Sequence, residues 1–377
     1  MENNTDFFYT PDYYDNFRCK GGSCRNTCCM GYSVGISMPE YFRLVGLTCS
    51  DDLRRRLDCG LKVREKPEKT DYAVIEPDWF GRCHALGEDG LCLLQKEQGA
   101  RVLPAVCRYY PRSPKRKYDS ECSCATACEE VLELLFHRSD PMTFSVRKLS
   151  FDMELEKRDE DSGKIREYPY VHKKIIGLMQ QREYSIDRRI ENIGRELSGC
   201  TDPVPAISLL PENKDADIQV LPELIEWCGR EYPTLSPFAD RVKSTFGEMS
   251  PEERKRKTEF LLARLKKTFP GIDLFFEQLM VNDMMFMYSP YTDGRLPVSY
   301  EYEALKIIHG MLCLLTACNT DENSTEKELT DVCVFFFRAV EFTAFRYNMF
   351  VLNGSAGNDN NDDNDNNNDD DDNGNAA

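Results

Sequence analysis

Hydrophobic residues recur at the spacing of amphipathic helices along the last two thirds of the chain. Most apolar positions lie three or four residues apart, and the segment 252–269 begins acidic and ends basic, as the dipole of a helix favours. The helices predicted from this pattern cover residues 165–197, 221–230, 252–269, 272–288, 300–318 and 326–352. We interpret the many aromatic residues on these segments as the core of a helical domain.

The first third of the chain carries shorter patterns. Apolar and polar residues alternate over residues 31–37, and a similar stretch at residues 72–77 precedes a proline, which predicts two short strands. Between them, Pro39 in a first turn predicts a helix that runs from Met38 towards Leu57. The chain as a whole is therefore predicted to be α+β and mostly α, with a cysteine-rich N-terminal region followed by a helical domain.

Changes in composition predict the domain boundaries. Residues 1–140 form the cysteine-rich part, residues 141–164 are charge-rich and predict a linker or loop, and residues 165–352 form the helical domain. Residues 353–377 are almost entirely Asn, Asp and Gly, which cannot bury apolar surface, so this tail is predicted to be disordered.

Ten of the 17 cysteines crowd into four groups within the first third of the chain. Thiolate is a soft ligand that selects zinc, iron–sulfur clusters or copper(I), and sulfurs brought together from separate loops are typical of a metal centre. The turn Gly87-Glu-Asp-Gly90 also predicts a hairpin that sets Cys83 and Cys92 opposite each other. The predicted metal ligands are Cys19, Cys24, Cys28, Cys29, Cys83, Cys92, Cys107 and Cys124.

Two other roles for cysteine remain open. Cysteine packs well as a small apolar residue, which is the role expected of the later cysteines, Cys200, Cys228, Cys313, Cys318 and Cys333. Disulfides would need an oxidising compartment, whereas the acidic N-terminus has no basic start and no apolar signal core. The adjacent pair Cys28 and Cys29 departs from the paired spacing of zinc ribbons, so zinc and an iron–sulfur cluster both remain possible metals.

The net charge of −17 bears on partners only after the tail is set apart. Asp residues between 359 and 372 supply eight of the negative charges, and the rest of the chain is moderately acidic. Nucleic acid is therefore not an expected partner. No apolar run reaches the length of a membrane span, so we expect no membrane segment and a cytoplasmic protein.

Arg108 and Arg112 follow Cys107 closely. A guanidinium can bind a carboxylate through two parallel hydrogen bonds, so these two side chains are predicted to hold a carboxylate beside the metal.

Three ordered motifs carry a family resemblance. They are Phe17-Arg-Cys-Lys-Gly-Gly-Ser-Cys-Arg-Asn-Thr-Cys-Cys-Met-Gly-Tyr-Ser-Val, then Asp89-Gly-Leu-Cys-Leu-Leu-Gln-Lys-Glu-Gln-Gly, then Cys107-Arg-Tyr-Tyr-Pro-Arg. Together they resemble the flagellin lysine-N-methylase family, and the likeness continues at Ser123-Cys124 and Phe276-Glu-Gln-Leu-Met-Val-Asn. The chain departs from the family pattern at Tyr32, where tryptophan is usual, and at Ala125, where proline is usual. Cys122 and Cys128 look like additions.

This resemblance implies a protein lysine N-methyltransferase. The methyl group would pass from S-adenosylmethionine to lysine ε-amines of flagellin, with a cysteine-held [4Fe-4S] cluster positioning the cofactor and zinc as the alternative metal. Arg108 and Arg112 would then bind the carboxylate of the cofactor. The chain has no strand followed by the glycine-rich turn of a doubly wound methyltransferase. The alternative is a zinc- or iron-chelating binding module without catalytic activity.

Overall fold

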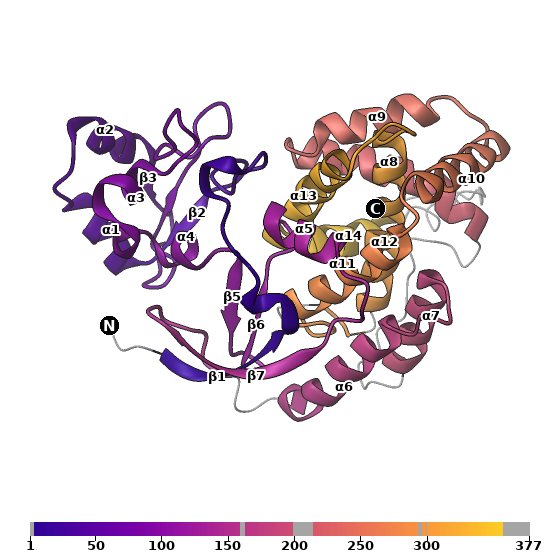
Figure 1. The fold of residues 1–377 in the computed structure, drawn as a ribbon, viewed down its shortest axis with the longest axis horizontal. Coiled ribbons are helices and arrows are strands. Elements are labelled where there is room, and N and C mark those ends of the chain that lie inside the picture. Colours follow the sequence, from indigo (N-terminus) through magenta and orange to yellow (C-terminus); the bar gives the residue numbers. More distant parts are fainter. Residues whose placement is uncertain (1–3, 159–162, 199–213, 293–295, 299, 357–377) are drawn as a thin grey trace, which may run out of the picture.

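The computed structural model describes residues 4–158, 163–198, 214–292, 296–298 and 300–356. Within them the predicted α+β, mostly α class is confirmed. A small lobe of short strands and helices lies on one side, a body of longer helices on the other, and a four-stranded sheet runs below both in the view of Figure 1.

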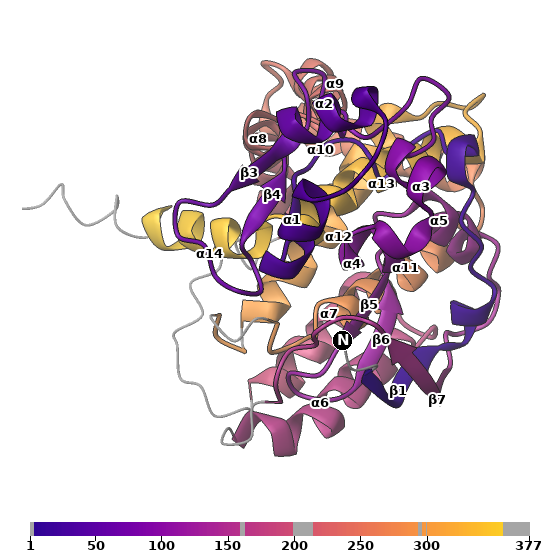
Figure 2. The same cartoon turned by 90° about the vertical axis from the view of Figure 1, so that its left-hand side faces the viewer.

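The four-stranded sheet is built from segments far apart in the sequence. Its order is β5 (Arg112–Lys115), β6 (Glu121–Cys124), β1 (Asn4–Pro11) and β7 (Phe144–Phe151). β1 runs antiparallel to β7 along its whole length and parallel to β6, with Tyr9 opposite Glu121. The N-terminal strand thus lies between β6, which carries Cys122 and Cys124, and β7, and the strands of this sheet lie together in the view of Figure 2 as well.

The small lobe holds the second sheet. β2 (Val34–Ile36), β4 (Ala73–Ile75) and β3 (Leu61–Val63) form it in that order, antiparallel throughout. Its helices are α1 (Met38–Val45), α2 (Asp51–Gly60), α3 (Leu93–Gln98) and α4 (Ala105–Tyr109). The predicted strands near residues 31–37 and 72–77 are present. The single helix predicted from Met38 is two helices, because Gly46 ends the first and Ser50 caps the second.

The body is made of ten helices within the described residues. They are α5 (Glu129–Phe136), α6 (Gly163–Met179), α7 (Ile186–Leu197), α8 (Lys214–Glu231), α9 (Ser236–Phe246), α10 (Pro251–Thr268), α11 (Ile272–Phe286), α12 (Tyr300–Asn319), α13 (Glu326–Phe342) and α14 (Phe345–Ala356). Two predicted helices are each divided in two, at residues 180–185 and at Thr343, and α9 was not predicted. No helix in this described part is long and apolar enough to cross a membrane.

The predicted linker at residues 141–164 contains β7, so that part of the prediction is wrong. The sequence Phe144-Ser-Val-Arg-Lys-Leu-Ser-Phe151 mixes charged and apolar residues because one face of this edge strand meets solvent. The predicted tail begins inside α14, which extends to Ala356; residues 357–377 lie outside the described part of the chain.

Buried side chains form two cores. The larger one joins the helices of the body to residues from β1, β6, β7 and α5, including Phe8, Tyr13 and Leu132. The smaller one lies within the small lobe, between Val34 and Leu103. The predicted domain ranges remain a prediction. The buried contacts join the first strand and the last cysteine group to the helical body rather than to the small lobe.

Candidate metal centre

Eight cysteines line one pocket between the two cores. They are Cys19, Cys24, Cys28, Cys29, Cys83, Cys92, Cys107 and Cys128. The pocket volume is about 160 Å³, roughly ten times the space that one water molecule needs. Its wall includes Phe17 from the large-core side and Val34, Ile75 and Leu94 from the small core. Seven of the eight predicted ligands thus converge in space.

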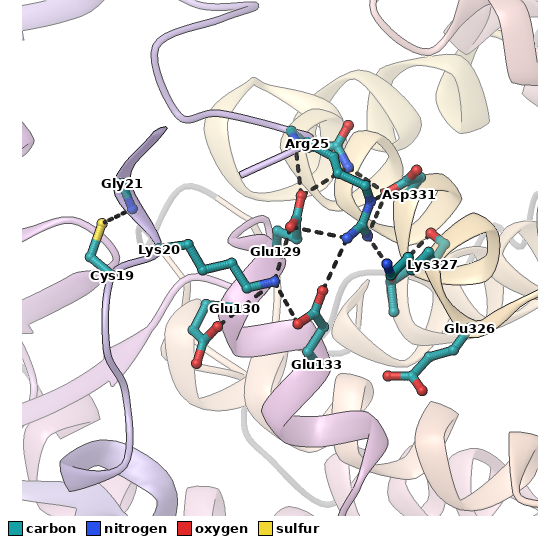
Figure 3. Close-up of polar contacts among 12 residues, drawn as sticks. Cys19, Lys20, Gly21, Arg25, Glu129, Glu130, Glu133, Glu326, Lys327 and Asp331 are labelled. Carbon is teal, nitrogen blue, oxygen red and sulfur yellow. Dashed lines mark hydrogen bonds and ion pairs between the residues drawn. The ribbon is translucent and has the colours of Figure 1, made fainter. Parts of the chain in front are cut away.

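Polar contacts fix the loop that carries the first cysteines against α5. Lys20 pairs with Glu129 at 3.0 Å, and Arg25 reaches Glu129 at 3.2 Å and Asp331 on α13 at 2.9 Å. Figure 3 shows these side chains converging on the first turn of α5, with Cys19 next to Lys20 on the loop. Glu129 also accepts a hydrogen bond from the backbone N–H of Asn26 at 2.8 Å. The loop is therefore docked on the helical body.

Arg338 of α13 holds the next part of the same loop. Its guanidinium donates to the backbone carbonyls of Asn26 at 2.7 Å, Thr27 at 3.0 Å and Met30 at 3.3 Å. The side chain is buried, and it lies over the ring of Phe335, 5.0 Å from its centroid. One arginine from the C-terminal part of the chain thereby sets the backbone that presents Cys28 and Cys29.

The hairpin predicted between Cys83 and Cys92 is present. Leu86 and Cys92 form a bridge, and the N–H of Gly87 donates to the carbonyl of Leu91 at 2.8 Å. The backbone N–H of Cys83 donates to the carbonyl of Cys29, also at 2.8 Å. This contact joins the hairpin to the first cysteine loop, so the sulfurs of both segments share the pocket.

The backbone N–H of Gly21 donates a hydrogen bond to the sulfur of Cys19 at 3.4 Å. Burial raises the pKa of Cys83, Cys92 and Cys128, and backbone N–H groups two or three residues further along partly offset this effect. Such bonds stabilise a thiolate and accompany cysteine ligands of iron–sulfur clusters.

Cys124 does not line the pocket. It lies on β6, fully buried, where the hydroxyl of Tyr13 accepts a hydrogen bond from its backbone N–H at 3.4 Å. Cys128 lines the pocket instead, directly before α5. The family resemblance treats Cys128 as an addition, so the predicted ligand set omits the cysteine that directly precedes this helix.

The thiols differ in their tendency to ionise. Burial raises the pKa of Cys24 and of Cys83 to about 11 and that of Cys128 to about 12. Cys28 instead donates a hydrogen bond to Cys29, which lowers the pKa of the Cys29 thiol to about 7. A bound cation would favour the thiolate form throughout, since metal ligation requires deprotonated sulfur.

Aromatic side chains form the inner end of the pocket. Tyr32 and Tyr110 both line it, and each ring lies near Phe342 of α13, with centroid distances of 5.3 and 6.1 Å. The hydroxyl of Tyr110 is buried without a hydrogen-bond partner. Aromatic faces attract cations, so this end of the pocket suits a positively charged group.

Within the described residues, no three His, Cys, Asp or Glu side chains are grouped closely enough to hold a single metal ion. Four sulfurs around one zinc ion stand only about 3.8 Å apart, given Zn–S bonds of roughly 2.3 Å. The pocket therefore brings the cysteines to one place without closing them around one ion.

The chain is similar to curated lysine-N-methylases. The lysine-N-methylases of Salmonella choleraesuis and Salmonella typhimurium are each 28% identical to it over 142 residues, which is 37% of this chain and 35% of each relative. The flagellar biosynthetic protein FliU of Salmonella muenchen is 28% identical over 141 residues, or 37% of this chain and 82% of that protein. No family model and no solved structure matches the chain.

These relatives support the family resemblance seen in the motifs. The similarity spans about a third of the length of the two lysine-N-methylases.

The two predicted cofactor arginines occupy different places. Arg108 pairs with the carboxylate of Asp152 at 3.1 Å and is not part of the pocket wall. Arg112 is not part of the pocket wall either; it lies over the rings of Tyr14 and Phe17, 5.1 and 4.8 Å from their centroids, and Phe17 lines the pocket. Their binding of a cofactor remains a prediction.

Proposed function

We propose that the protein is a protein lysine N-methyltransferase that moves a methyl group from S-adenosylmethionine to lysine ε-amines of flagellin. The observation that carries this proposal is the convergence of eight cysteines on one pocket in a chain similar to proteins named lysine-N-methylase and FliU.

The residues of the pocket fit a metal cofactor. Eight soft donors line one pocket, and the backbone N–H of Gly21 donates to the sulfur of Cys19. Cysteines from this set would hold a [4Fe-4S] cluster, with zinc as the alternative metal. When bound, a cluster with one iron position not taken by cysteine supplies a site for the amino and carboxylate groups of the cofactor.

The remaining task of the protein is alignment. The sulfonium of S-adenosylmethionine already makes its methyl group electrophilic, so the chain must place a neutral amine in line with it. Tyr32 and Tyr110 offer aromatic faces to a sulfonium at the inner end of the pocket. The apolar side chains of Val34, Ile75 and Leu94 exclude water beside them.

Arg112 is the better placed of the two arginines for the carboxylate of the cofactor, because Asp152 already occupies Arg108. The variant Arg112→Lys keeps the charge and loses the planar fork. It should weaken binding of S-adenosylmethionine, measured by calorimetry, and leave the metal content unchanged.

The test is incubation of anaerobically purified protein with flagellin and methyl-labelled S-adenosylmethionine. Label should enter flagellin lysines, located by mass spectrometry, and should not enter flagellin whose surface lysines have been acetylated beforehand. A chain that carries metal but neither binds the cofactor nor transfers label would be the chelating binding module instead, and the proposal would fall.

A further inference from the structure

Three ionisable side chains meet away from the metal pocket, where α12 contacts α7. His309 and Cys313 lie one turn apart on α12, and Nε2 of His309 is 3.5 Å from Sγ of Cys313. The other ring nitrogen of His309, Nδ1, is 3.0 Å from a carboxylate oxygen of Asp187, in the first turn of α7. A thiol, an imidazole and a carboxylate are therefore in hydrogen-bond contact in that order.

This group lies at the margin of the large core. The side chain of His309 is 12% exposed, and that of Asp187 is 54% exposed. Cys313 is partly buried and packs against the core, which is the role that the sequence predicted for it. Its contact with His309 and the carboxylate behind it was not predicted, because Asp187 belongs to a helix more than a hundred residues away. The group therefore borders solvent as well as the core.

His309 carries the positive charge of the group. Burial lowers the pKa of its imidazole, but Cys313 and Asp187 together raise it by more, to about 10. From α11, the ring of Phe276 lies edge-on to the imidazole, with the centroids 6.3 Å apart. The imidazole is therefore protonated at neutral pH, when both of its nitrogens are donors. A cation next to a thiol favours the thiolate.

Cys318 shows what a packing cysteine of the same helix looks like. It is also partly buried, but burial raises the pKa of its thiol to about 11, and the nearby hydroxyl is that of Thr245. Cys313 differs because a charged imidazole faces its sulfur. In the described chain no three such side chains are placed to bind a metal ion, so a metal does not account for the group.

We propose that Cys313 is a reactive thiol outside the metal pocket, activated by His309 and Asp187, and that it is oxidised by hydrogen peroxide. The thiolate attacks one peroxide oxygen, the O–O bond breaks, and the sulfur becomes a sulfenic acid. The leaving hydroxide takes the proton from Nε2 of His309 and departs as water. The sulfur thereby loses two electrons, which reduce the peroxide. Asp187 holds the imidazole in the orientation that this transfer needs.

Peroxide suits this position because the sulfur is partly buried among helices, where a small oxidant reaches it more easily than a bulky disulfide. The inference uses neither the metal pocket nor the transfer of a methyl group. It therefore stands or falls separately from the proposed function.

Alkylation rates test the activation of Cys313. Anaerobically purified, metal-loaded protein is treated with iodoacetamide over a series of pH values, and labelling of each cysteine is followed by peptide mass spectrometry with fragment spectra. An ordinary thiol carries only a few per cent of thiolate at pH 7. Cys313 should therefore react about tenfold faster than Cys318 at pH 7, and its rate should rise less with pH. Equal rates at pH 7 would overturn the proposal.

Two variants separate activation from exposure. His309→Gln removes the charge and keeps a polar side chain, so alkylation of Cys313 at pH 7 should fall about tenfold while that of Cys318 stays unchanged. Asp187→Asn, at a half-exposed position, should slow Cys313 less, because the imidazole stays beside the sulfur. If both variants keep the circular dichroism of the parent and Cys313 still reacts at the parent rate, His309 and Asp187 do not activate it.

Oxidation is tested with an equimolar amount of hydrogen peroxide in the presence of dimedone, which traps sulfenic acids. Cys313 should acquire the trap before Cys318 does, and His309→Gln should acquire less of it at the same dose. Fast alkylation of Cys313 without any trapped sulfenic acid would show that peroxide is not its oxidant, and the proposal would be wrong.

Discussion

Arg338 offers the sharpest test of how the helical body positions the metal pocket. Its guanidinium donates to three carbonyls of the loop between Asn26 and Met30. The substitution Arg338→Met keeps much of the apolar part of the side chain and removes every hydrogen-bond donor. Leaving such acceptors unpaired costs about 1–3 kcal/mol each when they stay buried. Water from the adjacent pocket can reach some of them, so we expect a total loss of about 2–4 kcal/mol.

With an unfolding entropy of about 2.1 cal/mol/K per residue, that loss lowers the Tm by about 2.5–5 °C in a chain of this length. The more diagnostic effect is on metal. The loop presents Cys28 and Cys29, so its release should reduce iron content by at least half under reconstitution conditions that saturate the parent.

Arg346 supplies a matched control. It is as buried as Arg338, but its ion pair is with Asp283 on α11 at 2.6 Å rather than with carbonyls of the cysteine loop. Breaking this buried pair in Arg346→Met costs about 3–5 kcal/mol, so the Tm should fall at least as far as in the Arg338 variant. Iron content should nevertheless match the parent. Equal iron loss in both variants, or full iron retention in Arg338→Met, would refute the reasoning.

Three further outcomes are expected. Burial raises the pKa of the Glu121 carboxyl to about 8, so the folded chain binds more protons than the unfolded chain between roughly pH 4.5 and 8. The free energy of unfolding should therefore fall as pH rises through this window. In Glu121→Gln, the free energy of unfolding measured with urea should change less with pH than in the parent. Cys128→Ser should lose iron that Cys124→Ser retains, and the opposite ranking would return Cys124 to the ligand set. Gly31 has φ +94°, and a Cβ there would lie 2.9 Å from a methyl carbon of Thr234. Gly31→Ala should therefore lower the free energy of unfolding by about 1–3 kcal/mol, measured by thermal denaturation. An unchanged Tm would show that the loop shifts freely.

The helices were predictable because their signal is local and repeated. Each long helix carries its own apolar face, and boundaries such as that of α10 are marked by a capping Ser250 with Glu253 three residues later. The strands of the larger sheet were missed for a physical reason. Glu121-Cys-Ser-Cys124 is buried on both faces, so it shows no alternation, and its partner β1 is an aromatic-rich segment more than a hundred residues away.

The sequence predicts what kind of site the pocket is, but it predicts only part of the set of cysteines that line it. Grouped thiols mark a metal centre at any spacing, so seven of the lining cysteines could be named from sequence alone. The choice between Cys124 and Cys128 depends on which residue ends β6 and which begins α5, a boundary that spacing does not resolve. The contribution of Arg338 could not be foreseen, because it depends on a contact across some three hundred residues.

The small size of the N-terminal lobe implies that metal binding contributes to the folding of this protein. Its core contains ten buried apolar side chains, far fewer than the core of the helical body. A core of that size contributes little stability by itself, and small units of this kind are commonly reinforced by disulfides or metals. The cysteines of the described chain are free thiols, and eight of them line the pocket between the lobe and the body. Metal bound there would hold the lobe to the body with free energy that also counts as folding free energy, because the unfolded chain has no such site. The pocket between the lobe and the body forms only when the lobe is docked. We therefore expect the pocket to be present in the metal-loaded protein. Chelation should open it before the helices of the body unfold.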